Sequence, residues 1–408
     1  MINDRGVHAF VPYPDAPDAL VAHADTGLLA GLSFAAKDLF DVAGYPTGGG
    51  NPFVLALSGI KTHTAPTVQK LLDAGARFVG KTVTDELAFS MNGQNAHFGA
   101  PVNGAAPLRI SGGSSSGSAS AVSNGLCDFA LGTDTGGSVR APASHCGLYG
   151  LRPTHGRISL QGALDLAPSF DTCGWFTRDA ATFARVAQVL LGDDTVPAPT
   201  RLLWPADLWS QLSPAAEASA LAAAERVQSV FGTGKGQGTG TGRATPVDVV
   251  LDSFDAMYWA FRYLQGREAW LTDGPLIERY APPLGPGVAE RFAFSRSVSD
   301  AQVGDAMAFR ERFSAHLDAL LGTDGVLLLP TMPDIAPLKT EPESALEDYR
   351  NRAIRLLCPA GLSRMPQLSL PMAGRAGAPM GLSLLGPRGS DRALVALAER
   401  LAGAGVGR

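Results

Sequence analysis

Helical stretches alternate with short apolar runs through the first half of the chain, and this alternation constrains the fold more than any other feature. Residues 64–74 carry apolar side chains at helical spacing and are followed by glycine, which commonly ends helices. A strand is expected at 77–79, a helix at 118–124 and another strand at 128–131. Such alternation is typical of layered α/β proteins, so we expect helices packed against a largely buried sheet.

Two glycine-rich turns that carry serines stand out within this pattern. Residues 112–118 contain Ser114, and residues 132–140 contain Ser138. Glycine permits conformations and close approaches that a Cβ would block, which leaves backbone N–H groups accessible beside the hydroxyls. Nucleophilic acyl chemistry needs an attacking oxygen together with amides that stabilise an oxyanion. The turns therefore indicate acyl transfer, for which the serine still requires a base.

Lys37 is the candidate base, because it directly follows the apolar run 32–36, which we interpret as a short buried strand. Burial lowers the pKa of a lysine, and a neutral amine can accept a proton. Lysines at strand ends are more often solvated, however. Position alone leaves both interpretations open.

Four segments of the chain together resemble the amidase signature family. They read FAAKDLFDV at 34–42, GGSSSGSAS at 112–120, GTDTGGSVR at 132–140 and CGLYGLRPT at 146–154. The resemblance is near-continuous from about residue 32 to 192 and resumes from 326 to 401. It implies an α/β fold with a single large mixed β-sheet surrounded by helices.

The resemblance also implies the catalytic roles. Ser138 matches the nucleophile, Ser114 matches a bridging serine that follows a cis peptide bond, and Lys37 matches the general base. The implied relay passes a proton from Ser138 to Ser114 and from Ser114 to Lys37 while Ser138 attacks the amide carbonyl. Ser114 then protonates the leaving amine, and water releases the acid from the acyl-enzyme. No cofactor and no metal is expected. The backbone amides implied to form the oxyanion hole are those of Thr135, Gly136, Gly137 and Ser138.

A single amidase domain is expected over residues 1–408. Within it, a signature core covers about 32–192, a variable middle region about 193–325, and a return to the core about 326–408. In the family the middle region helps to shape the acyl pocket. A helix is expected there at 214–231.

The substrate is predicted from a closer likeness within the family. Residues 85–99 and 285–291 look most like plant-type indole-3-acetamide amidases. We therefore expect hydrolysis of a small carboxamide to its acid and ammonia, with an aryl or indolyl acetamide favoured. The residues implied to approach the acyl site are Ala88, Phe89, Met91 and Asn92. For Phe89 and Met91, core packing is an equally good interpretation.

Two other functions compete with free amide hydrolysis. The glutamine-hydrolysing component of glutamyl-tRNA amidotransferase, which releases ammonia for a partner, resembles this chain in its signature region. The second competing function is that of a non-catalytic scaffold protein that keeps the fold of the family without its activity. The presence of Lys37, Ser114 and Ser138 together argues against the scaffold.

Several local motifs have a simpler explanation than catalysis. Ser115 occupies the nucleophile position of a GxSxG pattern, but no convincing strand precedes it. Residues 58–61 match SxxK without the companion motifs of penicillin-recognising enzymes. The alternating glycines at 232–242 lack a phosphate-loop pattern and favour a flexible loop. His97 could line the substrate cleft or be a loop histidine satisfied by a backbone partner.

Charge and composition narrow the functional classes. The net charge of −5 gives no basic footprint for nucleic acid, and 45% apolar with 17% charged residues suits a compact soluble enzyme. No signal peptide and no apolar stretch of about 20 residues is present, so no membrane partner is expected. Four cysteines without CxxC spacing indicate a reduced, cytoplasmic protein. The sequence is compatible with a homodimer.

Asp134 and Arg140 are expected to hold the nucleophile turn through charge-assisted hydrogen bonds.

Overall fold

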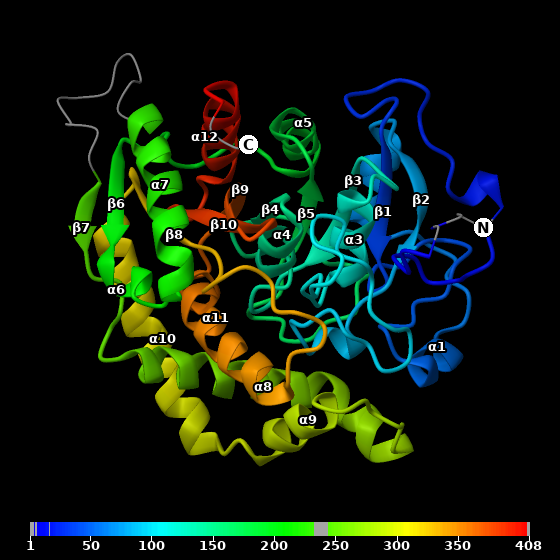
Figure 1. The fold of residues 1–408 in the computed structure, drawn as a ribbon. Helices are drawn as coiled ribbons and strands as arrows, with labels where there is room; N and C mark the ends of the chain where they lie inside the picture. The colour runs from blue at the N-terminus through cyan, green and yellow to red at the C-terminus, as the bar shows by residue number, and fades with distance from the viewer. Residues whose placement is uncertain (1–3, 5, 16, 232–243, 406–408) are drawn as a thin grey trace.

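A mixed sheet of ten strands runs through the whole molecule in this computed structural model, which describes residues 4, 6–15, 17–231 and 244–405 (Figure 1). Parallel pairing joins β1 to β2 and β3, and β6 to β7 and β8, whereas the central strands pair antiparallel. Strands from all three expected regions of the chain therefore share one sheet. In sheet order they are β2 (Arg77–Thr82), β1 (Ser33–Lys37), β3 (Phe129–Thr133), β5 (Cys173–Thr177), β4 (Tyr149–Arg152), β9 (Gln367–Arg375), β10 (Ala378–Leu385), β8 (Gly325–Pro330), β6 (Arg201–Pro205) and β7 (Thr245–Val247).

Side chains that alternate along each strand pack into different clusters on the two faces of the sheet. Phe34 and Ala36 of β1 join the core formed with one helical layer, whereas Ala35 packs with α3 and α4 on the opposite face. The first layer consists of α2 (Pro66–Asp73), α5 (Ala180–Leu190), α7 (Pro214–Phe231) and α12 (Asp391–Gly403). Both faces are covered, which explains why the strands are apolar almost throughout.

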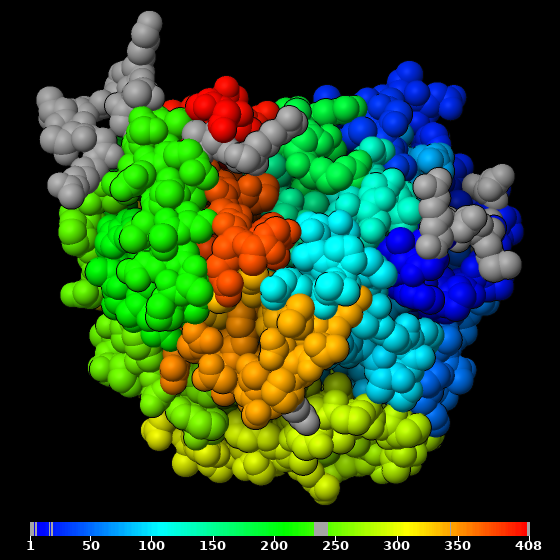
Figure 2. Space-filling view, in the orientation of Figure 1, coloured from blue at the N-terminus to red at the C-terminus, as the bar shows by residue number. Residues whose placement is uncertain are grey.

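The opposite face carries the helices that bear on function. α3 (Ser116–Ser123) and α4 (Arg140–Cys146) each begin just after one of the serine turns. Further along the sheet lie α8 (Phe254–Tyr280), α10 (Asp300–Leu321) and α11 (Glu343–Ser363), with α9 (Val288–Ser297) packed on α8. Figure 2 shows α11 in orange between the yellow residues of this layer and the cyan residues of the signature region. The remaining short elements are η1 (Asp18–Leu20), α1 (Pro52–Ser58), η2 (Glu86–Ala88) and α6 (Ala206–Trp209).

The expected fold class is confirmed, since the sheet is large, mixed and covered by helices. The helix expected at 214–231 has those bounds, and the longer helix α8 that follows it includes Pro275. All four cysteines are free and buried. The glycine-rich run at 232–242 lies outside the described residues. Within the described ranges no helix combines the length and apolarity that a membrane crossing requires.

Candidate active site

Lys37 is fully buried at the C-terminal end of β1, beside the end of the parallel strand β3. Its Nζ donates to Ser114 Oγ at 2.7 Å and to Thr133 Oγ1 at 2.8 Å. Burial lowers the pKa of Lys37 to about 7, although the carboxylates of Asp85, Asp171 and Asp134 act in the opposite direction. The surface-lysine interpretation is therefore wrong. A lysine with this pKa is substantially neutral near pH 7 and can accept a proton.

The turn that carries Ser114 is fixed against two neighbouring segments. The peptide bond between Gly113 and Ser114 is cis, the geometry that the family resemblance implies at this position. Ser114 O accepts from the backbone N–H of Asp85 at 3.0 Å. A Cβ on Gly113 would collide with the carboxylate of Asp85, which explains the need for glycine here. Ser115 Oγ donates to Thr133 O at 3.2 Å, so Ser115 anchors the turn to β3.

Ser138 follows β3 in a turn that a buried carboxylate organises. The carboxylate of Asp134 accepts from the backbone N–H groups of Gly137 at 2.9 Å and Val139 at 3.1 Å. Arg140 donates to the same carboxylate through Nε at 2.9 Å and Nη2 at 2.8 Å, and Arg152 Nη1 approaches to 3.1 Å. Burial raises the pKa of Asp134, but the two guanidinium groups outweigh burial and hold it below its ordinary value. The expected role of Asp134 and Arg140 is confirmed.

The turn that carries Ser138 has three backbone N–H groups without an acceptor in the part of the chain that the structure describes. Among the described residues, no acceptor takes the N–H groups of Thr135, Gly136 or Ser138. Gly137 is different, because its N–H already donates to Asp134. Of the four amides expected to form an oxyanion hole, the structure thus leaves three available. The two serine turns meet where Ser115 N donates to Ser138 O at 3.3 Å.

A cavity of about 30 Å³ opens beside Ser138. Ala88, Phe89 and Met91 line the cavity as expected, whereas Asn92 does not. Gly136, expected in the oxyanion hole, also lines the cavity. The lining residues that the sequence did not single out are Ser90, Phe261, Arg262, Gln265, Arg350 and Ile354.

Similarity to known proteins extends over most of the chain. A family profile described as Amidase matches residues 15–219. Over 395 residues the chain is 40% identical to Amidase 1 of Arabidopsis thaliana, and the match covers 92% of this chain and 93% of that protein. The chain belongs to the amidase family. It is therefore an amide-hydrolysing enzyme.

Two further relatives agree with this assignment. A solved structure described as an amidase matches 93% of this chain and 85% of its own, with a TM-score of 0.79 and 30% identity. The chain is also 29% identical over 413 residues to the A component of glutamyl-tRNA(Gln) amidotransferase from Methanothermobacter thermautotrophicus, covering 98% of this chain and 90% of that protein. This amidotransferase component is more distant from the chain than Amidase 1 is.

The sequence did not predict that Thr133 contacts Lys37 in this amidase. Its hydroxyl accepts from Lys37, but no local motif singles it out, because threonine is common in strands. A signal was nevertheless available. Thr133 lies within GTDTGGSVR at the end of β3, and parallel pairing of β3 with β1 brings that end to Lys37.

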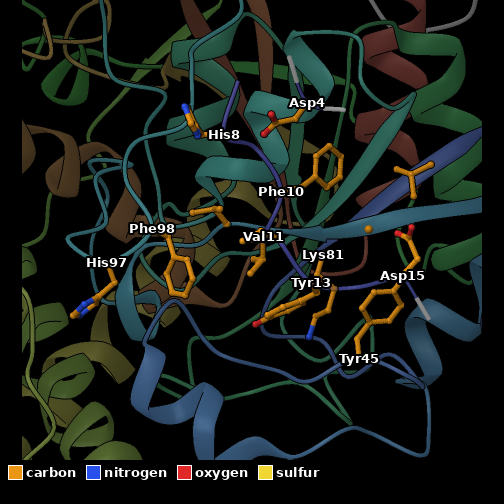
Figure 3. Close-up of a pocket in the computed structure, with 14 residues that line it drawn as sticks. Asp4, His8, Phe10, Val11, Tyr13, Asp15, Tyr45, Lys81, His97 and Phe98 are labelled. Carbon is orange, nitrogen blue, oxygen red and sulfur yellow. The ribbon is translucent and has the colours of Figure 1, made fainter. Parts of the chain in front are cut away.

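Another cavity of the enzyme, of about 410 Å³, lies between the N-terminal segment and β2 (Figure 3). Neither Ser114 nor Ser138 lines it. Figure 3 shows Tyr13 and Lys81 next to each other there. Both contact Asp38, with Lys81 Nζ at 2.8 Å and the Tyr13 hydroxyl at 2.8 Å. His97 also lines this cavity and pairs with Glu86 at 2.9 Å. The ring partner of His97 is thus the side chain of Glu86 and not the expected backbone group, and His97 does not line the cavity beside Ser138.

Clusters of potential metal ligands do not occur in the described part of the chain. Across residues 4, 6–15, 17–231 and 244–405, no group of three or more histidine, cysteine, aspartate and glutamate side chains is placed to hold a metal ion.

Proposed function

We propose that this enzyme hydrolyses a small carboxamide to its carboxylic acid and ammonia through an acyl-enzyme on Ser138. The observation that carries the proposal is the 2.7 Å contact between Lys37 Nζ and Ser114 Oγ. Because burial lowers the pKa of Lys37 to about 7, the amine can take the Ser114 proton near neutral pH. Ser114 in turn takes the proton of Ser138, whose Oγ forms the bond to the amide carbonyl carbon.

Oxyanion stabilisation would come from the free amides of Thr135, Gly136 and Ser138. Each such donor can lower the barrier by about 3 kcal/mol in a water-poor site. Asp134 supports this role indirectly, because it fixes the turn through Gly137 and Val139. Collapse of the tetrahedral intermediate breaks the C–N bond, and Ser114 supplies the proton that the departing nitrogen needs. Water then cleaves the ester, and the same groups return a proton to Ser138 as the acid leaves.

For the acyl group, the sequence prediction of an aryl or indolyl acetamide stands as our proposal. The apolar lining residues Phe89, Met91 and Phe261 support it, since they could contact a ring. Glutamine hydrolysis for a partner is the second candidate, supported by the amidotransferase relative. We also propose a cytoplasmic location, supported by the free, buried cysteines.

The test is ammonia release by the purified chain over aliphatic, aryl, indolyl and amino-acid amides. We expect turnover of at least one simple amide with no second protein co-eluting, and no turnover by Ser138→Ala. Turnover of glutamine alone, and only with a partner present, would favour the amidotransferase role. Substantial activity in Ser138→Ala would assign the nucleophile to another residue.

A further inference from the structure

Three arginines gather around the catalytic cavity without enough negative charge to balance them. Arg262 of α8 and Arg350 of α11 line the cavity together with Ser138. Burial lowers the pKa of Arg291 of α9 to about 9, and the guanidinium groups of Arg350 and Arg262 act in the same direction. Burial likewise lowers the pKa of Arg262 to about 10, so Arg262 and Arg291 both stay charged at neutral pH.

Their partners are few. Arg350 is 7% exposed and pairs with Glu347 at 2.9 Å, and the side chain of Glu347 is 52% exposed. Among the described residues, Arg262 and Arg291 have no ion pair, and the Nε of each is buried without a hydrogen-bond partner. The guanidinium carbon of Arg262 lies 5.0 Å from the centre of the Phe294 ring, a contact that supplies no negative charge. Arg262 and Arg291 are half-buried, and buried polar atoms are normally paired, so two buried Nε atoms without partners close to a catalytic cavity are unusual.

Nearby acids do not provide the missing charge. Asp85 is the other carboxylate that acts on Arg291, but burial raises the pKa of Asp85, which disfavours its charged form. The region therefore keeps an excess of positive charge. An anionic ligand would satisfy the unpaired donors and relieve the repulsion between guanidinium groups.

We propose that the acyl group of the substrate carries a carboxylate, which Arg262 and Arg350 bind with Arg291 nearby, so that the enzyme acts on a monoamide of a dicarboxylic acid. This inference rests on the proposed amide hydrolysis for its orientation, with the amide at Ser138 and the carboxylate at the arginines. With an aromatic spacer the substrate is an aryl acetamide that also carries a carboxylate, which narrows the aryl acetamide proposed above. With an aliphatic spacer the substrate would replace it, and the carboxylate is the feature that both spacers share. Arg262 and Arg350 thus determine specificity and take no part in the proton relay.

The test uses two matched pairs of ligands that differ by a methyl group in place of a carboxylate. The aliphatic pair is butyramide and succinamate, and the aromatic pair is 4-methylphenylacetamide and 4-carboxyphenylacetamide. Binding is measured by calorimetry on Ser138→Ala, which needs no turnover, and kcat/KM is measured on the unmodified enzyme. We expect the carboxylate member of at least one pair to bind at least tenfold more tightly, and that pair to identify the spacer.

Arg262→Gln and Arg350→Gln, each combined with Ser138→Ala, should remove the preference by weakening the carboxylate ligand at least tenfold while leaving the methyl ligand within about twofold. Arg352→Gln is the matched control on α11, because Arg352 pairs with the exposed Asp348 and does not line the cavity. A purely structural role of the arginines would weaken both ligands equally.

Equal affinity for both members of each pair, no detectable binding of either carboxylate at millimolar concentration, or a preference that survives both substitutions would overturn the inference. If the carboxylates bind preferentially but are not hydrolysed by the unmodified enzyme, the proposed hydrolysis fails and the anion site stands. If only neutral amides are bound and hydrolysed, the hydrolysis stands and the anion site fails.

Discussion

Replacing Thr133 by valine should move the pH dependence of the enzyme to lower pH. Thr133 Oγ1 accepts a hydrogen bond from Lys37 Nζ at 2.8 Å, and valine keeps the shape of the side chain without the acceptor. A charged ammonium gains more from such an acceptor than a neutral amine does. Loss of the acceptor therefore lowers the pKa of Lys37 further.

The size of the effect follows from the unmodified enzyme. With Lys37 titrating at about 7, kcat/KM should rise about tenfold from pH 6 to pH 8 and then level off. An ordinary lysine would instead give a rise of about a hundredfold between pH 7 and pH 9. If the lost hydrogen bond favours the ammonium by about 1 kcal/mol, the midpoint in Thr133→Val moves down by about 0.5 to 1 pH unit.

The assay is the initial rate of ammonia release from the best amide between pH 5.5 and 9.5, with activity rechecked after return to neutral pH. Thr67→Val is a matched control, because Thr67 is buried on α2 and its hydroxyl donates to Ser159 O and does not contact Lys37. The control should leave the midpoint unchanged. A flat profile from pH 6 to 9 in the unmodified enzyme, or an upward shift in Thr133→Val, would refute the assignment of Lys37 as the titrating base.

Three further substitutions test other parts of the site. Lys37→Ala should lower kcat by at least about a thousandfold while circular dichroism stays unchanged, because no other base contacts Ser114 among the described residues; full activity would contradict the relay. Arg140→Gln should lower the free energy of unfolding in urea by about 3 kcal/mol, since it removes a buried partner of Asp134; an unchanged midpoint would show that Arg152 alone suffices. Gly136→Ala should lower kcat while the free energy of unfolding changes little, because the added Cβ would lie 2.6 Å from Phe261 Cζ and shift the turn. An unchanged kcat in a normally folded variant would show that Gly136 is not part of the oxyanion hole.

The local parts of the fold and site were predictable from sequence. The expected strand at 32–36 and helix at 214–231 follow from short-range apolar patterns, and the structure has them as Ser33–Lys37 and Pro214–Phe231. The serine turns were recognisable because their glycines and serines lie within a few residues of one another in the sequence. Patterns of this kind are set by backbone propensities and by the period of burial.

The rest of the site depends on contacts between distant segments. Arg350 reaches the cavity only because α11 packs against α8, and no local pattern in 343–363 indicates that position. That the N–H of Gly137 is already bonded could not be predicted either, because it depends on the direction in which the Asp134 carboxylate points. The unbalanced charge of Arg262 is likewise invisible in sequence, because it depends on which carboxylates fail to approach. Long-range packing decides these features.

The most direct test of the account is to locate the covalent adduct formed by a fluorophosphonate, which reacts with an activated serine and loses fluoride. Intact mass and peptide mapping should find one adduct per chain on Ser138, with none in Ser138→Ala and strongly slowed labelling in Lys37→Ala. Labelling of Ser114 or Ser115 in the unmodified enzyme, or undiminished labelling of Ser138→Ala, would contradict the Ser138 acyl-enzyme on which the proposed function rests.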